Sequence, residues 1–474
     1  MKDMGRRVQG VVIHNAQTAP PWGRGLSALG AVQRTVPVLG GVLLLLFGLP
    51  GVAFAASGGA QISAGDTAWL LASSALVLLM TPGLAFYYGG LVRRKNVVTT
   101  LFQVFAVIAV VSVQWVVFGY SLAFGPDVGH IVGNLSWAFL NNITSNGGGT
   151  YAGTVPALAF SIFQMMFAII TPALIVGGLA ERVKFSSFIA FIVLWATFVY
   201  DPLAHWVWGH GGWLAGLGLL DFAGGTVVHV SSGVAGLVAA IYLGRRHAVG
   251  GKVVVRAHNV PMVLLGTALL WFGWFGFNAG SALSANSVAA VAFMTTNTAT
   301  AASAISWMLM ERWKAGRVTL VGASAGAVAG LVAITPAAGF VTPAASILIG
   351  LGSGVVCYLG SSVLKNRFGY DDALDAFGGH GVGGTFGALA TGLFATVAVN
   401  SAGANGLFYG NPHQVLIQLL GVLAAWTLSG VGTYLILRFV DAVMGLRVKT
   451  EDEHIGLDLV LHSEAAYTEG EETA

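Results

Sequence analysis

Residues 155–184 read VPALAFSIFQMMFAIITPALIVGGLAERVK. Residues 155–180 of this stretch contain no Asp, Glu, Lys, Arg or His. A helix needs about 20 mostly apolar residues to cross the hydrocarbon core of a bilayer, so this run is long enough for one crossing. The charged residues 181–184 end the apolar run abruptly. The stretch therefore predicts a transmembrane helix that ends at a membrane surface.

The composition of the whole chain extends this prediction. Only 9% of the 474 residues are charged, 56% are hydrophobic and 67 are glycine. Soluble domains carry about 25% charged residues, so a soluble enzyme and a disordered chain are both excluded. The net charge of +3 does not indicate nucleic-acid binding. The single cysteine, Cys357, rules out an intramolecular disulfide and a multi-cysteine zinc site, and we expect no metal and no cofactor.

Ten further apolar runs resemble the one at 155–180, and the sequence predicts an all-α, polytopic membrane protein with eleven transmembrane helices. The predicted spans are 67–92, 97–124, 155–180, 185–203, 224–244, 260–280, 287–310, 318–338, 343–364, 375–398 and 413–437. The segments that follow the odd-numbered spans contain Lys and Arg, whereas the segments that follow the even-numbered spans contain neither. The positive-inside rule then places the N-terminus outside the cell membrane and the C-terminus in the cytoplasm.

The first 55 residues have the pattern of an export signal. Basic residues precede the apolar run 36–51, and small residues at 53, 55 and 56 form a cleavage site after Ala55. The alternative is an additional, uncleaved helix. The domain boundaries that we expect are an N-terminal extension with a signal peptide at 1–55, a transmembrane domain at 63–440 and a cytoplasmic regulatory tail at 441–474.

An odd number of spans suggests two inverted five-helix repeats followed by a final helix. Matched features support this arrangement. His229 in the fifth span and His380 in the tenth are each followed by glycine at +4 and +7. A Thr-Pro-Ala triplet occurs in the third span and again in the eighth, and Asp-x-x-Gly-Gly precedes each histidine, at 221–225 and at 375–379.

The two histidines are the strongest functional candidates because ionisable residues inside a membrane are costly. A single buried histidine is usually a satisfied structural residue. Two at repeat-equivalent positions would meet near the bilayer midplane. Glycines at +4 and +7 share a helix face with their histidine and allow close packing. Two adjacent imidazoles would share at most one excess proton, which predicts a proton relay.

At this point the motifs resemble those of the Amt/MEP/Rh ammonium transporter family, in its bacterial Amt branch. The matching segments are PGLAFYYGGL (82–91), FQMMF (163–167), GGLAERVK (177–184), DFAGGTVVH (221–229), HNVPM (258–262), GWFGFNAGS (273–281) and the segment 371–381, which begins with DD and ends with FGGHG. The resemblance covers about residues 63 to 467. It implies a homotrimer with one substrate path through each subunit.

The resemblance also implies an outer vestibule that binds ammonium at Phe167, Trp208 and Ser281. Aromatic faces attract cations, and a hydroxyl supplies one acceptor. Phe167 and Phe277 would form a phenylalanine gate below this site. Considered without the family, the two phenylalanines are more often packing residues, Trp208 belongs to an interfacial aromatic belt, and Ser281 is a helix cap.

Below the gate, the resemblance implies that His229 and His380 line an apolar pore as twin histidines. Asp221 is expected to be a structural acidic residue that bonds backbone groups, not a direct ligand. Five other histidines are expected to have no transport role: four at the external loops or helix ends, and one at the start of the sixth span with a capping or structural function. These are His130, His205, His210, His413 and His258.

The expected function is transmembrane ammonium transport, with deprotonation beneath the vestibule, passage of ammonia and separate proton transfer. The alternatives are an electroneutral ammonia gas channel and an ammonium sensor that signals through a partner. The sensor is less favoured because the tail after Arg438 is too short for a fused signalling domain. Nothing indicates an enzyme. In many bacterial relatives a PII-type nitrogen regulatory protein blocks the cytoplasmic face, and we expect the same partner here.

Overall fold

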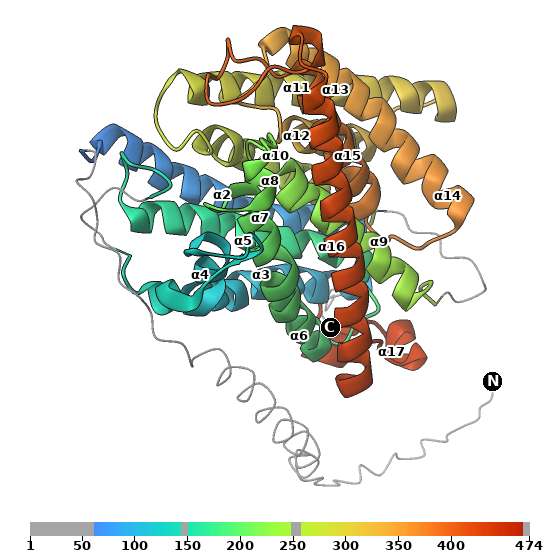
Figure 1. Cartoon of the computed structure of the whole chain (residues 1–474). Coiled ribbons are helices and arrows are strands. Elements are labelled where there is room, and N and C mark those ends of the chain that lie inside the picture. Colours follow the sequence, from blue (N-terminus) through green and yellow to red (C-terminus); the bar gives the residue numbers. More distant parts are fainter. Residues whose placement is uncertain (1–60, 144–149, 248–256, 468–474) are drawn as a thin grey trace, which may run out of the picture. The chain divides into compact units, whose positions relative to one another are not determined.

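The computed structural model describes residues 61–143, 150–247 and 257–467. The predicted signal peptide at 1–55 lies outside the described residues. The described chain is mainly helical (Figure 1). Its only strands are β1 (Asp127–Val128) and β2 (Val132–Gly133), which pair as a short antiparallel hairpin.

The helices up to residue 247 cover the first five predicted spans. They are α2 (Ala64–Leu91), η2 (Arg94–Asn96), α3 (Val97–Gln114), η3 (Trp115–Gly119), α4 (Tyr120–Phe124), η4 (Leu135–Leu140), α5 (Ala157–Leu179), α6 (Phe185–Trp195), η5 (Ala196–Tyr200), α7 (Asp201–Trp208), α8 (Trp213–Gly216), η6 (Gly225–Val230) and α9 (Ser231–Leu243).

The helices from residue 257 onward cover the other six predicted spans and part of the tail. They are α10 (Val260–Trp274), η7 (Phe275–Ala279), α11 (Ser287–Ala315), α12 (Leu320–Ile334), α13 (Pro343–Tyr358), η8 (Leu359–Leu364), α14 (Lys365–Phe368), η9 (Phe377–Gly381), α15 (Val382–Phe394), η10 (Leu407–Tyr409), α16 (His413–Met444), α17 (Thr450–Ile455) and η11 (Asp458–His462).

Each predicted span contains helix, and nine helical segments within the described residues are long and apolar enough to cross a membrane. The predicted span 318–338 is longer than its helix, because α12 ends at Ile334 after 15 residues. Pro336 has no N–H to continue the helix, and the chain turns there. In contrast, Pro172 lies inside α5 without ending it. Other predicted spans end too early, since α7 continues to Trp208, α11 to Ala315 and α16 to Met444.

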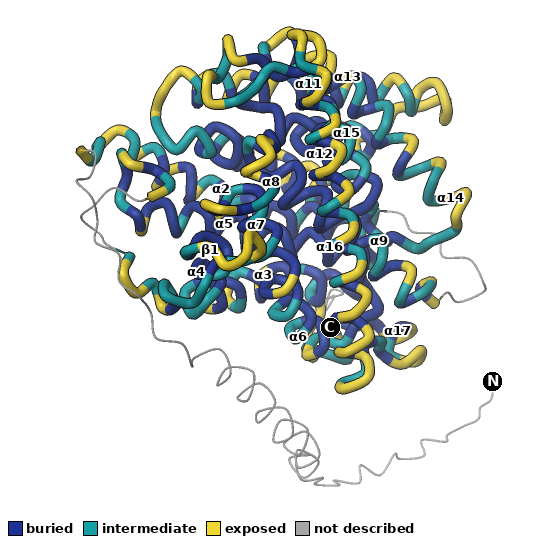
Figure 2. The backbone as a smooth tube through the Cα atoms, in the orientation of Figure 1, coloured by how far each residue is buried: buried dark blue, intermediate teal, exposed yellow. Residues whose placement is uncertain are grey.

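Helix α5 is the central element of the described chain. In its most apolar window 94% of the residues are buried, against 28% for α16. Figure 2 shows buried segments grouped in the interior and exposed segments at the periphery, including much of α16. Large apolar side chains such as Phe105, Val113 and Leu423 are exposed on the outer helices. Lipid contact explains such surfaces in a membrane protein.

The C-terminal tail is docked against the ends of α2, α3 and α10. The carboxylate of Asp458 accepts hydrogen bonds from the backbone N–H groups of Val98 and Thr99 at the start of α3. The hydroxyl of Tyr467 lies 2.9 Å from Nε2 of His258, which precedes α10. The other nitrogen of that ring, Nδ1, lies 3.0 Å from the carbonyl oxygen of Val92. His258 therefore links the tail to the end of the first helix.

Candidate functional site

Two buried histidines meet inside the helical bundle. His229 lies in the π-helical turn η6 and His380 in the π-helical turn η9, and their Nδ1 atoms are 3.2 Å apart. Both side chains are almost fully buried. Single π-helical turns inside α-helices are frequent at functional sites. The structure thus brings together the two residues that the sequence singled out first.

Glycines at +4 from each histidine explain this close approach. A Cβ atom at Gly233 would lie 2.0 Å from the backbone nitrogen of Gly381, and a Cβ at Gly384 would lie 3.0 Å from Cβ of His229. Gly384 lies beside His229, whereas Gly233 lies beside Gly381, so the residue numbers run in opposite directions along the two helices. The two helices therefore run antiparallel, and each presents its glycine to the turn that carries the other histidine.

Asp221 holds the start of the first histidine turn. Its carboxylate accepts four hydrogen bonds, of 2.6–3.2 Å, from the backbone N–H groups of residues 224–227. A turn's first N–H groups otherwise lack partners. Burial raises the pKa of the Asp221 carboxyl, while the four amide groups act in the opposite direction.

The corresponding acidic residue in the second histidine turn is Asp372, which the Asp-x-x-Gly-Gly match missed. Asp221 and Asp372 both stand eight residues before a histidine, and an oxygen of Asp372 accepts the N–H of Phe377 at 2.8 Å. Gly224 and Asp375 both stand five residues before a histidine and both have positive φ, 109° and 57°. The predicted correspondence between Asp221 and Asp375 is therefore three residues out of register.

Two stacked phenyl rings cover the histidine pair. The ring centroids of Phe167 and Phe277 are 4.2 Å apart with 27° between the planes. The indole of Trp208 meets Phe167 edge-on at 6.1 Å. On the other side, the Phe277 ring lies 6.0 Å from the His229 ring. The order along this line is thus tryptophan, two phenylalanines and two histidines.

Trp208 and Ser281 are held by backbone atoms near the phenyl pair. Nε1 of Trp208 donates to the carbonyl oxygen of Asp221 at 2.9 Å, which fixes the indole at the end of α7. The hydroxyl of Ser281 donates to the carbonyl oxygen of Phe277 at 2.8 Å. Across the described part of the chain, no hydrogen bond joins Ser281 to Trp208. Ser281 retains its oxygen lone pairs as acceptors.

The histidines face a narrow internal cavity of about 10 Å³, which is room for about one water-sized molecule. It is lined by Met80, Leu84, Tyr87, Ile170, Leu174, His229, Leu270, Trp274, Phe277, Val328 and His380. Nε2 of His229 has no hydrogen-bond partner among the described residues. An apolar cavity with an unpartnered imidazole nitrogen can bind a small, neutral hydrogen-bonding molecule.

Sequence reasoning did not identify Trp274 as part of this site. Its indole is stacked against the His229 ring with centroids 5.3 Å apart, and its Nε1 donates to the Thr335 hydroxyl. The available signal was spacing, because Trp274 precedes Phe277 by three residues and shares its helix face. It also joins α10 to the Thr-Pro-Ala turn after α12.

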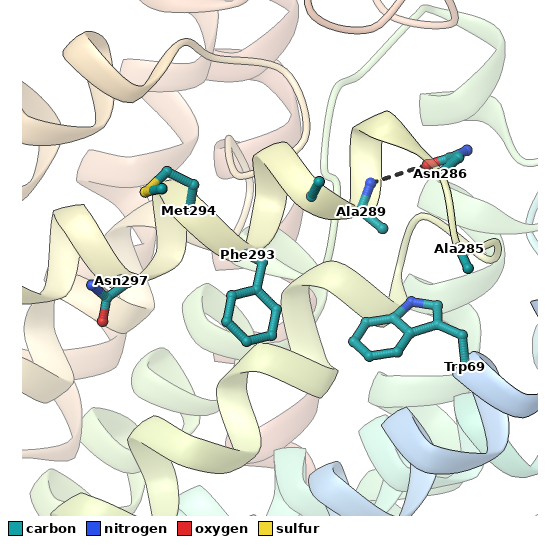
Figure 3. Close-up of a pocket in the computed structure, with 8 residues that line it drawn as sticks. Trp69, Ala285, Asn286, Ala289, Phe293, Met294 and Asn297 are labelled. Carbon is teal, nitrogen blue, oxygen red and sulfur yellow. Dashed lines mark hydrogen bonds between the residues drawn. The ribbon is translucent and has the colours of Figure 1, made fainter.

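A second hollow, of about 550 Å³, lies on the outer surface between α2 and α11 (Figure 3). Trp69 enters it from α2, while Phe293, Met294 and Asn297 line it from α11. Its lining contains no titratable side chain. The interior cavity, and not this surface groove, therefore combines the chemistry and the burial of a candidate site.

Comparisons with known proteins identify the family. Residues 68–467 match the model of the Ammonium Transporter Family. The chain is 53% identical to an ammonium transporter of Bacillus subtilis (strain 168) over 403 residues, or 85% of this chain and 98% of that one. It is 49% identical to an ammonium transporter of Aquifex aeolicus over 432 residues, covering 90% and 98% of the two chains.

Solved structures with the same fold include the crystal structure of Saccharomyces cerevisiae Mep2. That structure aligns with a TM-score of 0.78 and 37% identity over 82% of this chain and 89% of the other. A protein described as a sensor Amt protein aligns with a TM-score of 0.77 and 30% identity, covering 84% and 98%. By sequence and by fold, the chain belongs to the ammonium transporter family.

Proposed function

We propose that this chain captures ammonium at Trp208, Phe167 and Ser281, removes a proton and conducts ammonia past His229 and His380. The observation that carries the proposal is the hydrogen-bonded histidine pair inside an apolar cavity that two stacked phenyl rings close. Each step follows from the chemistry of the groups in that order.

Capture depends on aromatic faces and a hydroxyl rather than on a carboxylate. Ammonium is a compact cation with four donors, and indole and phenyl faces attract it within about 6 Å. The Ser281 oxygen supplies an acceptor. A carboxylate in contact with the ion would bind it tightly and slow its release. Asp221, whose backbone carbonyl accepts from Trp208, has its carboxylate oxygens occupied by four backbone N–H groups.

The phenyl pair sorts the substrate by charge. At a separation of 4.2 Å the rings of Phe167 and Phe277 leave no space between them, so passage requires one ring to move. The cavity beyond is largely apolar. A charged ion would lose its hydration there at a cost of many kcal/mol, whereas neutral ammonia loses much less. Ammonium therefore leaves its proton behind before the molecule enters.

The histidine pair can exchange protons with ammonia. In the neutral pair, one Nδ1 donates to the other across 3.2 Å. The donating ring then has a bare Nε2 and the accepting ring has Nε2–H. One ring can accept from ammonia while the other donates to its lone pair. One excess proton keeps the shared bond, but two would place like charges side by side.

We further propose the membrane arrangement that this function requires: eleven crossings, two inverted five-helix repeats, an external N-terminus and a cytoplasmic C-terminus in the cell membrane. Helix within every predicted span and the reciprocal glycine contacts support it. From family membership we propose a homotrimer and a PII-type regulatory partner at the tail face. Native mass spectrometry of the purified protein, alone and with a PII protein, tests both.

The decisive experiment measures current and flux together in proteoliposomes after an ammonium jump. We expect a transient inward current in the wild type and a loss of more than about tenfold in His380→Ala, which lacks half of the proton pair. Uptake that is unchanged in both His229→Asp and His380→Ala would reject the relay. Undiminished ammonia flux without current would favour the gas channel.

One observation favours a second candidate, the ammonium sensor. The sensor Amt protein shares the fold at 30% identity. Ammonium binding to the purified protein with no uptake in the same proteoliposomes would support sensing. Saturable uptake at a rate well above that of protein-free vesicles would support transport.

A further inference from the structure

The chain turns sharply directly after Trp208, the last residue of α7. The backbone N–H of Gly209 donates to the carbonyl oxygen of His205 at 2.9 Å, and Gly211 has φ of 93°. A Cβ atom at Gly209 would lie only 2.5 Å from Nδ1 of His205. The turn at 209–212 is therefore folded back against the His205 ring.

His205 is fully buried, unlike the exposed His130, His210 and His413 with which the sequence grouped it. Its Nδ1 lies 3.0 Å from the carbonyl oxygen of Ala123 in α4, and its Nε2 lies 2.9 Å from Oδ1 of Asp127. Carbonyl and carboxylate oxygens only accept. The ring is thus held from both sides, at Nδ1 by a backbone carbonyl and at Nε2 by a carboxylate.

Asp127 and its neighbour His130 contact the other side of the turn. A Cβ atom at Gly211 would lie 2.6 Å from Cβ of Asp127, and Nδ1 of His130 lies 2.6 Å from the carbonyl oxygen of Gly211. The Asp127 carboxylate also accepts from the backbone N–H of His130. Burial opposes ionisation of Asp127, but the hydrogen bonds from His205 and His130 hold its pKa below the usual value.

We propose that His205 and Asp127 are positioning residues for Trp208. Together they clamp the turn at 209–212 between α4 and the β1–β2 hairpin, and this clamp sets where α7 ends and how its terminal indole meets Phe167. The inference rests on the proposed capture of ammonium at Trp208. It assigns a function to a histidine that the pore does not use.

The test is the ammonium dependence of uptake in proteoliposomes for His205→Gln, Trp208→Leu and the double variant. We expect His205→Gln to raise the half-saturating concentration about tenfold while the maximal rate stays within about twofold, as expected when only binding is lost. If His205 acts through Trp208, the double variant should be no worse than Trp208→Leu alone. His413→Gln, a change in an exposed histidine, is the matched control and should match the wild type.

Additive effects in the double variant, or a fall in maximal rate at unchanged half-saturation, would overturn the inference. If His205→Gln does not fold, Asp127→Asn preserves side-chain size, removes the charge and replaces one acceptor oxygen by an NH₂ donor. It should raise the half-saturating concentration about threefold, and an unchanged value would reject the clamp. If Trp208→Leu itself leaves half-saturation unchanged, the proposed capture site fails. If only the His205 and Asp127 variants behave like wild type, the clamp alone fails.

Discussion

The two histidine turns perform the same task with different residues. In the first, Asp221 accepts four backbone N–H groups, and the left-handed position is glycine. In the second, Asp372 accepts the N–H of Phe377 and leaves its Oδ1 without a partner among the described residues, while the left-handed position is Asp375. The two turns therefore share their backbone geometry but not the interactions that stabilise it.

The largest expected difference is in the acidic residues. Asp221→Asn places an amide N–H₂ against two of the four backbone donors and should lower the free energy of unfolding by about 4 kcal/mol. Asp372→Asn keeps one oxygen that can accept the N–H of Phe377, and it should change the free energy of unfolding by less than about 1 kcal/mol. Unfolding of the purified variants in a detergent titration measures both. Equal losses would show that the two turns are stabilised alike.

The next comparison concerns the residue that stands four positions before each histidine. A Cβ atom at Gly225 would lie 2.5 Å from the ring of Pro336, whereas the second turn has Ala376 at this position. Gly225→Ala should therefore cost about 2–3 kcal/mol through overpacking. Ala376→Gly should cost about 1 kcal/mol, from lost packing and added chain entropy. The same titration checks the pair, and a harmless Gly225→Ala would contradict the close contact.

The left-handed position offers a smaller contrast. Gly224 has φ of 109°, and a Cβ there would lie 2.6 Å from a methyl of Val228, so Gly224→Ala should cost about 2 kcal/mol. Asp375→Gly relieves strain at φ of 57° but removes the 2.8 Å ion pair with Lys365. These terms nearly cancel, to within about 0.5 kcal/mol. A large loss in Asp375→Gly would show that the ion pair dominates.

The smallest expected effect is a pH dependence that arises from Asp372 in the second turn. Burial raises the pKa of Asp372 to about 6, and the nearby Asp375 adds to this shift. Because the folded-state pKa exceeds the unfolded value of about 4, the folded protein binds the proton more tightly. Stability from this group is therefore complete below pH 4 and is lost as pH rises through 6.

We expect unfolding midpoints of the wild type to reflect a loss of about 1 kcal/mol between pH 5 and pH 7, and Asp372→Asn to lose this component. Asp375→Asn, which removes a neighbouring charge, should reduce it only in part. An identical pH dependence in the wild type and Asp372→Asn would show that Asp372 is not its cause.

Much of the architecture could be predicted because membrane insertion is governed by local sequence. Apolar length determines which segments can span, so helix lies in each predicted run. The errors lie where a local pattern competes with a tertiary contact. Each proline is the middle residue of its own Thr-Pro-Ala triplet. Even so, α12 ends before Pro336, whereas α5 continues past Pro172. Helix ends near Trp208 depend on side chains that arrive from a distant hairpin.

The class of protein, the candidate spans, the two histidines and the glycines beside them could all be predicted from the sequence, since each depends on the cost of burial or on spacing along one helix. Three features emerged only from the folded chain: Asp372 corresponds to Asp221, Trp274 joins the cavity, and His205 is buried against Asp127 beside Trp208. These depend on which atoms meet across the bundle. No periodicity within a single segment encodes a partner that lies on another helix.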